Sequence, residues 1–201
     1  MIPADTKVVT YVSRGMESIR GFDIFMKVAK RVCAECSDVV FVVVGEDRVA
    51  YGGDLRYTNG KTFKQWVLDQ DDYDLSRIKF LGRISPPELA KLFSLSDVHV
   101  YLTIPFVLSW SLMNALACGT TVIASDTAPV REMIQHGETG LLVDFFDVDA
   151  FAAAINRVLD DQPGHHPLGE ATQQLIEERY SLEKCLPETL TLYENVVSRR
   201  R

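Results

Sequence analysis

The sequence lacks the features of a membrane protein, a secreted protein and a nucleic-acid-binding protein. None of its hydrophobic runs approaches the ~20 residues of a membrane-spanning helix. Residues 1–5 lack the apolar stretch of a signal peptide. The net charge is -7, with 28 acidic against 21 basic residues, whereas contacts to many phosphates need a basic face. We expect a cytoplasmic chain with no transmembrane segment and no nucleic-acid partner. A local basic pocket for one phosphorylated ligand stays compatible with this charge.

Cysteine is scarce, and metal or cofactor motifs are missing. Cys33 and Cys36 form the only C-x2-C pair among four cysteines, without the second ligand pair of a zinc site or the strand-to-helix turn of a thioredoxin-like pair. Both fall on the apolar stripe of a predicted helix, so we expect buried, reduced core cysteines. The four histidines form no ligand constellation, and we expect His99 to be a hydrogen-bonded core residue. No G-x-G-x-x-G follows the first predicted strand, which argues against a dinucleotide-dependent dehydrogenase. We expect neither a metal nor a cofactor.

What the sequence does contain is a regular alternation of strand and helix patterns. Strand-like apolar runs cover residues 8–13, 39–45, 78–82, 98–102, 121–124 and 141–143. Several are continuous, which is typical of strands covered on both faces. Between them, Asp147 opens an amphipathic helix, and Ser85 to Glu88 form a capping box with proline at the first helical position. The pattern predicts a single α/β domain over residues 1–201, a doubly wound, Rossmann-like parallel sheet.

Three segments interrupt this alternation. Residues 46–74 are long and polar, and we expect one short helix there, over residues 63–68. Residues 162–167 contain two prolines and a glycine and predict a surface turn before the closing helices. Pro187 lies inside the last helical pattern and should kink or restart that helix.

Candidate binding residues follow the predicted strands, because ligands of open parallel sheets bind beyond the carboxyl ends of the strands. Arg14 and Arg20, six residues apart, follow the first strand beside a predicted helix N-terminus. Two guanidinium groups there suit a diphosphate, and the alternative is two solvated arginines on a loop. After the fourth strand comes a helix that is apolar almost all round, as expected of a buried helix, except for Ser111 and Asn114. These two either cap neighbouring backbone or face a ligand crevice.

Short motifs between Tyr11 and Val196 resemble, in order and spacing, the C-terminal domain of family 4 glycosyltransferases, also called group 1 glycosyl transferases, which have the GT-B fold. The motifs are Tyr11-Val12-Ser13-Arg14, Arg20-Gly21, Val42-Val43-Val44-Gly45, Phe80-Leu81-Gly82-Arg83, Ser96-Asp97-Val98, Ala115-Leu116-Ala117-Cys118-Gly119, Val122-Ile123-Ala124-Ser125 and Gly137-Glu138-Thr139-Gly140-Leu141-Leu142-Val143. The resemblance therefore implies the C-terminal half of a GT-B enzyme.

The resemblance also implies roles for particular residues. Arg14 and Arg20 would contact the donor diphosphate, with arginine where the family has lysine. The implied sugar-binding backbone N–H groups belong to Val107, Leu108 and Ser109, and the implied base-lining residues are Arg83 and Ile84. The family's E-x7-E motif falls on Phe106 and Asn114, and its second glutamate binds the donor ribose. Asn114 can accept one hydrogen bond there but brings no charge.

The implied function is the donor-binding half of a retaining glycosyltransferase that uses a nucleoside-diphosphate sugar and no metal. A sugar or lipid-linked acceptor would bind through an N-terminal domain outside this chain, which alone should be inactive. The full-length enzyme would be cytoplasmic or peripheral to the membrane. One alternative is a degenerate nucleotide-sugar-binding module without transferase activity, motivated by Phe106 and Asn114. Another, a sugar-nucleotide epimerase or other Rossmann-type enzyme, is disfavoured by the missing glycine fingerprint.

Overall fold

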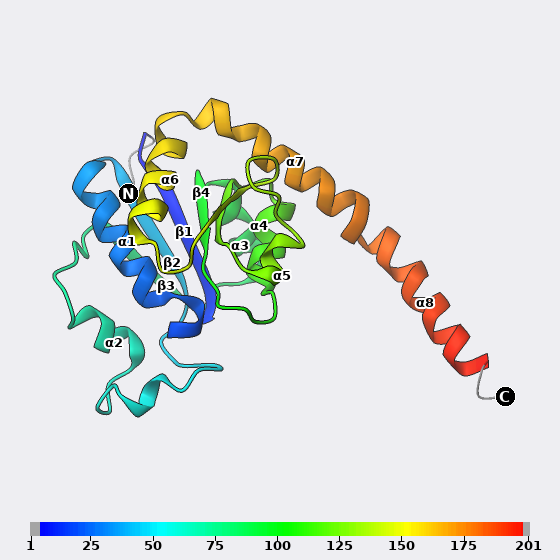
Figure 1. Ribbon diagram of the computed structural model, residues 1–201, viewed down its shortest axis with the longest axis horizontal. Helices are drawn as coiled ribbons and strands as arrows, with labels where there is room; N and C mark the ends of the chain where they lie inside the picture. The colour runs from blue at the N-terminus through cyan, green and yellow to red at the C-terminus, as the bar shows by residue number, and fades with distance from the viewer. Residues whose placement is uncertain (1–4, 199–201) are drawn as a thin grey trace.

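A computed structural model of the chain describes residues 5–198 and shows one six-stranded sheet between two layers of helices (Figure 1). All strand pairs are parallel, and the order is β3-β2-β1-β4-β5-β6. The strands are β1 (Lys7–Gly15), β2 (Val39–Glu46), β3 (Ile78–Gly82), β4 (Val98–Tyr101), β5 (Val122–Ser125) and β6 (Leu141–Val143). Each of the six predicted strands overlaps one of these, so the predicted doubly wound α/β sheet is confirmed.

The helices cover the sheet on both faces. They are α1 (Phe22–Glu35), α2 (Phe63–Leu68), α3 (Pro86–Ser94), α4 (Trp110–Ala117), α5 (Ala128–Arg131), α6 (Val148–Asp160), α7 (Gln162–Tyr180) and α8 (Leu182–Ser198). α1 and α6 pack together on one face, whereas α3, α4 and α5 supply the core of the other. α7 packs against α4 and leads into α8, which extends away from the sheet (Figure 1).

Alternating side chains of the central strand divide the core between the two faces. Val9 and Tyr11 of β1 belong to the cluster under α1 and α6, where the Tyr11 ring lies 4.7 Å from the Phe25 ring. Val12 belongs to the cluster under α4, with Leu112. Because both faces are covered, β2 is apolar from Val39 to Val44 instead of alternating.

The helix starts that the sequence indicates are confirmed. The Glu88 carboxylate accepts hydrogen bonds from the N–H and the hydroxyl group of Ser85. Asp147 Oδ1 accepts from the N–H of Ala150, 2.9 Å away, at the start of α6. The expected helix over residues 63–68 is α2. Local capping chemistry was therefore sufficient to place these helix starts.

One prediction about the C-terminal region is wrong, and of the two effects predicted for Pro187, a kink or a restart, the restart does not occur there. Residues 162–167 do not form a surface turn but begin α7, with Pro163 in the first turn, where a helix needs no N–H donor. The restart between the last two helices falls at Ser181, which has extended dihedral angles (φ -64°, ψ 157°), and α8 continues through Pro187. α8 has no buried residue, so water can bind the backbone carbonyl group that Pro187 cannot pair.

The cysteine prediction is also partly wrong. Cys33 and Cys36 are free thiols, as expected, but both are half-buried, and Cys36 lies just beyond the last residue of α1. The amphipathic stripe of α1 is buried only as far as Val32, because the chain then turns toward β2. Residues 1–4, on which most of the signal-peptide argument depends, lie outside the described residues. Between residues 5 and 198, no helix combines the length and the apolarity needed to cross a membrane.

Candidate functional site

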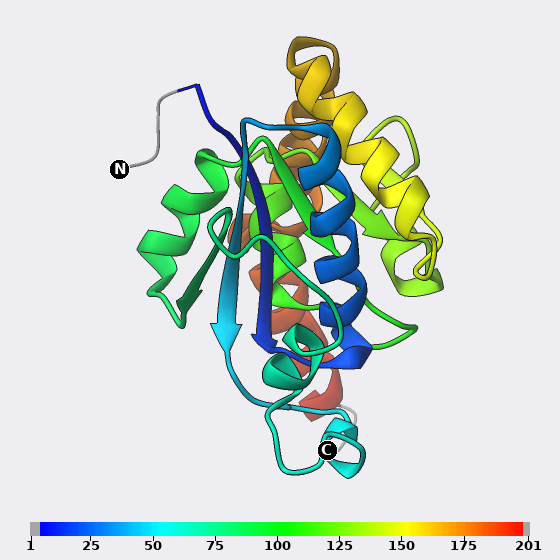
Figure 2. The same ribbon diagram turned by 90° about the vertical axis from the view of Figure 1, so that its left-hand side faces the viewer.

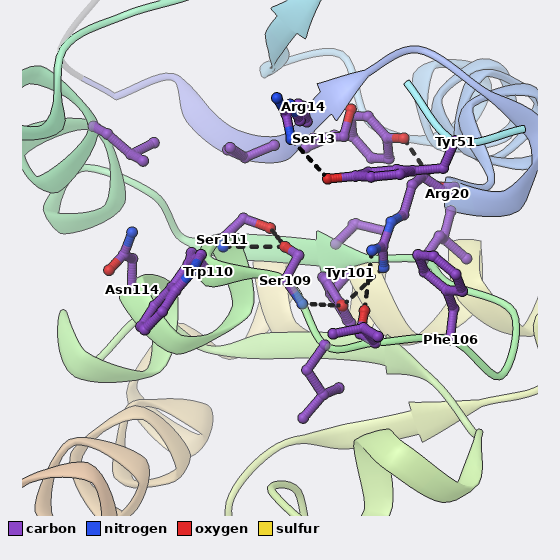
Figure 3. A pocket seen from close by; sticks show the side chains of 17 residues that line it. Ser13, Arg14, Arg20, Tyr51, Tyr101, Phe106, Ser109, Trp110, Ser111 and Asn114 are labelled. Carbon is purple, nitrogen blue, oxygen red and sulfur yellow. Dashed lines mark hydrogen bonds between the residues drawn. The ribbon is translucent and has the colours of Figure 1, made fainter. Parts of the chain in front are cut away.

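A cavity of ≈ 500 Å³, here called the main cavity, opens beyond the carboxyl ends of β1 and β4 (Figure 3). The strand order reverses between these two strands, since β1 continues to β2 and β3 on one side and β4 to β5 and β6 on the other. Such a switch point leaves a crevice at the sheet edge, the usual ligand position in open α/β sheets. The lining residues include Arg14, Arg20, Tyr51, Phe106, Val107, Leu108, Ser109, Trp110, Ser111 and Asn114. Seven of the nine residues predicted for the site therefore lie around one cavity.

Arg20 is the buried cation of the main cavity, with 7% of its surface exposed. It ends a 3-10 turn (Ser18–Arg20) that is followed by Gly21, whose φ is 64°. A Cβ atom on Gly21 would lie 2.7 Å from the Cβ atom of Leu102, so glycine is needed both for the backbone angle and for the close approach to the residue that follows β4. This turn fixes the direction in which the Arg20 side chain leaves the backbone.

The contacts of the Arg20 guanidinium group are all with neutral groups. It donates to Thr103 Oγ1 at 2.9 Å, to the carbonyl oxygen of Val107 at 3.0 Å and to the Tyr101 hydroxyl group at 3.3 Å (Figure 3). The Phe106 ring centroid lies 5.1 Å from its Cζ atom. Among residues 5–198, no carboxylate forms an ion pair with Arg20. A buried cation without a counter-charge makes this wall favourable for an anion.

Arg14 lies on the opposite wall and is exposed. Its Nη1 donates to the Tyr51 hydroxyl group at 3.0 Å, and its Cζ lies 5.8 Å from the Tyr51 ring centroid. The Tyr51 ring in turn lies 5.7 Å from the Phe106 ring. Arg14 and Arg20 therefore line the same cavity, as the sequence predicts, with an aromatic pair between them.

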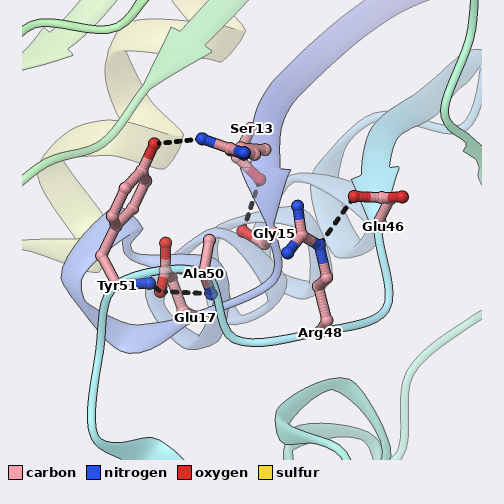
Figure 4. A network of polar contacts seen from close by, with 8 residues as sticks. Ser13, Gly15, Glu17, Glu46, Arg48, Ala50 and Tyr51 are labelled. Carbon is pink, nitrogen blue, oxygen red and sulfur yellow. Dashed lines mark hydrogen bonds and ion pairs between the residues drawn. The ribbon is translucent and has the colours of Figure 1, made fainter.

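The position of Tyr51 depends on a buried carboxylate that sequence reasoning missed. Glu17 is 0% exposed, and its Oε2 accepts the N–H groups of Ala50, Tyr51 and Gly52 at 2.8–3.0 Å (Figure 4). A second buried carboxylate, Asp54, accepts the N–H group of Ser18 at 3.0 Å. These bonds tie the polar segment after β2 to the loop after β1, at the edge where both strands end (Figure 2). An acidic residue between the two candidate arginines was the available signal.

The loop before α4 offers fewer free donors than the sequence predicts. Ser109 caps α4 by accepting the Ser111 N–H group, and its own N–H group donates to the Tyr101 hydroxyl group at 3.0 Å. It therefore cannot also serve a bound sugar without rearranging. The N–H groups of Val107 and Leu108 have no acceptor in the described part of the chain. The predicted set of three is thus reduced to two.

α4 is buried on one side only, and the predicted exceptions Ser111 and Asn114 lie on the side that borders the main cavity. Leu112, Ala115 and Leu116 are buried, while Trp110 is 81% exposed and Asn114 is exposed. The exposed side forms part of the cavity wall, which explains why an apolar helix carries polar residues there. Of the two alternatives that the sequence left open, Ser111 takes the second: it lines the cavity, and its hydroxyl group contacts the hydroxyl group of Ser109 instead of capping backbone. The Asn114 side chain makes no hydrogen bond to the described residues and faces the crevice (Figure 3).

Arg83 and Ile84 lie outside the main cavity. They line a neighbouring cavity of ≈ 320 Å³, the side cavity, which shares Val12, Ser13, Arg14 and Leu89 with the main one. The two cavities therefore continue along the sheet edge from β4 to β3. An elongated ligand with a charged middle would pass Arg14, where the cavities meet.

His99 plays no part in this site. It is fully buried in β4, and its Nδ1 lies 3.1 Å from Thr10 Oγ1, which confirms the expected core histidine. Burial lowers its pKa to about 3, so the ring is neutral. Within residues 5–198, no cluster of three or more His, Cys, Asp or Glu side chains could hold a metal ion.

The fold is a Rossmann-like α/β domain, and its arginine pair lies at the switch point, where ligands of open parallel sheets usually bind. Sequence comparison gives the family. Residues 1–175 match the family described as "Glycosyl transferases group 1", and the chain belongs to it.

Several curated relatives are similar to this chain. N-acetyl-alpha-D-glucosaminyl L-malate synthase of Bacillus anthracis is 30% identical over 121 residues, which are 60% of this chain and 31% of that protein. D-inositol 3-phosphate glycosyltransferase of Corynebacterium aurimucosum is 26% identical over 171 residues, 85% of this chain and 39% of that protein. Phosphatidyl-myo-inositol mannosyltransferase of Mycolicibacterium smegmatis is 26% identical over 200 residues, 96% and 46% respectively. The chain spans less than half of each of these relatives.

Solved structures share the fold. Sucrose-phosphate synthase from Thermosynechococcus elongatus superposes with a TM-score of 0.81 at 28% identity, covering 98% of this chain and 47% of that one. Anabaena HepE in complex with UDP-glucose has a TM-score of 0.75 at 20% identity, covering 97% and 50%. The C-terminal domain of the group 1 family protein LpcC from Francisella tularensis was solved by itself and has a TM-score of 0.68 at 20% identity, covering 88% of each chain. The sheet and its helices therefore have the architecture of one half of a GT-B glycosyltransferase.

Proposed function

We propose that this chain is the donor-binding half of a retaining glycosyltransferase and binds a nucleoside-diphosphate sugar in the main and side cavities. The observation that carries the proposal is the buried Arg20 guanidinium group, which faces the main cavity without a carboxylate partner among the described residues. A diphosphate would supply the missing charge between Arg20 and Arg14. The base would occupy the side cavity by Arg83 and Ile84, and the sugar would lie near the N–H groups of Val107 and Leu108.

The two arginines could assist sugar transfer by stabilising the charge that develops on the leaving group. As the bond from the sugar to the diphosphate breaks, the leaving diphosphate gains negative charge. Two arginines positioned in advance stabilise that charge more in the transition state than in the ground state, which lowers the barrier. Because the guanidinium groups supply the positive charge, we propose that no divalent metal is required.

The acceptor would bind through a second domain. The chain spans less than half of the curated relatives described above, and half or less of sucrose-phosphate synthase and HepE. In that reading, residues 1–201 are the C-terminal domain of a longer enzyme, and a sugar or lipid-linked acceptor is held by the other half. The isolated chain should then transfer no sugar, because nothing holds the acceptor within attack distance. A cytoplasmic or membrane-peripheral location of the whole enzyme stays a prediction.

A titration of UDP, ADP and GDP into the 201-residue chain tests this proposal. Half of the crevice would be missing, so we expect a Kd between micromolar and millimolar, about -8 to -4 kcal/mol, that EDTA leaves unchanged. Absence of binding to every nucleotide, or binding that EDTA abolishes, would contradict it.

A degenerate nucleotide-sugar-binding module is the second candidate. It is favoured by Asn114, which lines the main cavity in place of the ribose-binding glutamate implied by the family, and by Phe106, which stacks near Arg20. The active transferase and the degenerate module can be distinguished by measuring sugar transfer with a longer protein that includes the upstream domain. A degenerate module would bind the donor without turnover.

A further inference from the structure

Tyr51 lies between the two arginines, and within the described residues its hydroxyl group accepts a hydrogen bond but donates none. Its oxygen accepts a hydrogen bond from Arg14 Nη1 at 3.0 Å, while its own proton has no acceptor in the described part of the chain. The residue is 51% exposed and lines the main cavity. A hydroxyl group polarised by a cation is a strong donor toward a further anion.

The backbone around Tyr51 is held by hydrogen bonds to one buried carboxylate. Glu17 Oε2 accepts three successive N–H groups, those of residues 50–52, and such charge-assisted bonds are the strong kind. Gly15 allows the close approach of this segment, because a Cβ atom there would collide with the backbone oxygen of Arg48. The Tyr51 side chain is thereby brought against Phe106, which covers Arg20 (Figure 3).

We propose that Tyr51 is a third ligand of the phosphate group, and that Glu17 is the residue that positions it. The Tyr51 hydroxyl group donates to a phosphate oxygen while it accepts from Arg14, so the phosphate group is bound from the Arg14 and Tyr51 side as well as from Arg20. Glu17 touches no ligand and acts through the backbone of residues 50–52. This inference rests on the proposed function for the identity of the nucleotide, but it needs only an anion at the arginine pair.

The test uses Tyr51→Phe, which removes one hydroxyl group and keeps the ring contact with Phe106. Tyr193→Phe is the matched control, because Tyr193 lies on the exposed helix α8, outside the main cavity. Kd is measured by calorimetry for UDP, for inorganic pyrophosphate and for uridine. We expect Tyr51→Phe to weaken UDP and pyrophosphate about tenfold, to leave uridine unchanged, and Tyr193→Phe to change nothing. Wild-type affinity of Tyr51→Phe for both phosphate ligands would overturn the proposal.

The role of Glu17 is tested by a double-mutant cycle. Glu17→Gln keeps the shape and replaces three charge-assisted bonds by neutral ones, so UDP and pyrophosphate should bind several-fold more weakly. In a Tyr51→Ala background, Glu17→Gln should have no further effect on affinity. An undiminished effect there would show that Glu17 supports the fold in general, and would overturn the positioning role.

The outcomes also separate this inference from the proposed function. Pyrophosphate binding that depends on Tyr51, without binding of any nucleotide, supports the phosphate ligand and contradicts the donor-binding function. Nucleotide binding that is indifferent to Tyr51→Phe supports the function and overturns the inference. Failure of the wild-type chain to bind either kind of ligand overturns both.

Discussion

The two walls of the main cavity carry the same side chain in different settings. Arg20 is 7% exposed and donates to three oxygen atoms of the segment 101–107, whereas Arg14 is exposed and held by the single hydroxyl group of Tyr51. The Arg20 wall is preorganised, because its donors are already fixed before a ligand arrives. The Arg14 wall is more open to water, since Arg14 is exposed at the end of β1 and Tyr51 is 51% exposed, so these side chains can adjust. The difference suggests a division of work, in which one arginine supplies affinity and the other adapts to the ligand.

Removing the buried arginine should have the largest effect. Arg20→Met should weaken nucleotide binding about 100-fold, at the upper end of the roughly 1.5–3 kcal/mol that hydrogen bonds to charged groups contribute. The stability of the free protein should not fall, since the Tyr101 hydroxyl group keeps the Ser109 N–H group and Thr103 Oγ1 keeps the Ile104 carbonyl oxygen. Losing a buried charge that has no counter-charge is itself not costly. Titration calorimetry and thermal melting measure the two quantities.

Arg77→Met provides the matched control for that prediction. Arg77 is a half-buried arginine outside both cavities, and it donates to the carbonyl oxygens of Cys33 at 2.8 Å and of Val39 at 3.2 Å. Its loss should lower the melting temperature and leave nucleotide affinity unchanged, the reverse of Arg20→Met. If Arg20→Met behaves like Arg77→Met, Arg20 is a structural arginine and the anion site is wrong.

The buried His99 makes the stability of the folded protein depend on pH below 6.5, so the affinities of the two sets of variants should be compared above that pH. Burial lowers its pKa to about 3 in the folded state, below the 6.5 of an unperturbed histidine, so only the unfolded state takes up its proton between these values. Stability is therefore unaffected above pH 6.5 and falls below it, by about 2 kcal/mol at pH 5 from this residue. Urea unfolding at pH 7 and pH 5 measures the loss, and His99→Leu should remove that share of the pH dependence. An unchanged slope in the variant would contradict the assignment.

The adjustable wall should respond less. Arg14→Met removes an exposed guanidinium group that water already screens, together with the cation that polarises the Tyr51 hydroxyl group, so we expect nucleotide affinity to fall about twentyfold, and less in high salt. Stability should stay the same, because the exposed Arg14 side chain has a single hydrogen bond within residues 5–198, to the Tyr51 hydroxyl group. Calorimetry at two salt concentrations checks both statements. A loss as large as that of Arg20→Met would remove the distinction between the walls.

Much of this arrangement could be predicted from local sequence. Apolar runs placed the strands, capping residues placed α3 and α6, and the rule that ligands bind beyond strand ends selected Arg14, Arg20 and Asn114. The roles of these residues stay predictions, but their meeting at one cavity follows from the parallel sheet. No local pattern could place Tyr51, because its position depends on a buried carboxylate 34 residues away in the chain.

The wrong predictions also concern residues whose structure depends on contacts with distant parts of the chain. Residues 162–167 have the composition of a turn, yet they begin α7, which packs against α4. Gly169 makes that packing close, since a Cβ atom there would collide with the backbone of Gly119. The exposure of Trp110 was not predicted, because an apolar residue in a helix gives no sign that it borders a cavity.

The smallest expected change in nucleotide affinity concerns Asn114, which lines the main cavity on α4. Asn114→Glu restores the carboxylate that the family resemblance implies for ribose binding and should strengthen nucleotide binding about threefold, the modest gain expected of a charge-assisted bond open to water. Because Asn114 is exposed, the substitution should not change the stability of the free protein. Comparing UDP with its 2′,3′-dideoxy analogue identifies the partner, since the gain should vanish when the ribose hydroxyl groups are absent. A gain that persists with the analogue would mean that the new carboxylate meets another part of the ligand. No gain with either nucleotide would strengthen the case for a degenerate module, whose preorganised wall binds phosphate but no longer recognises ribose.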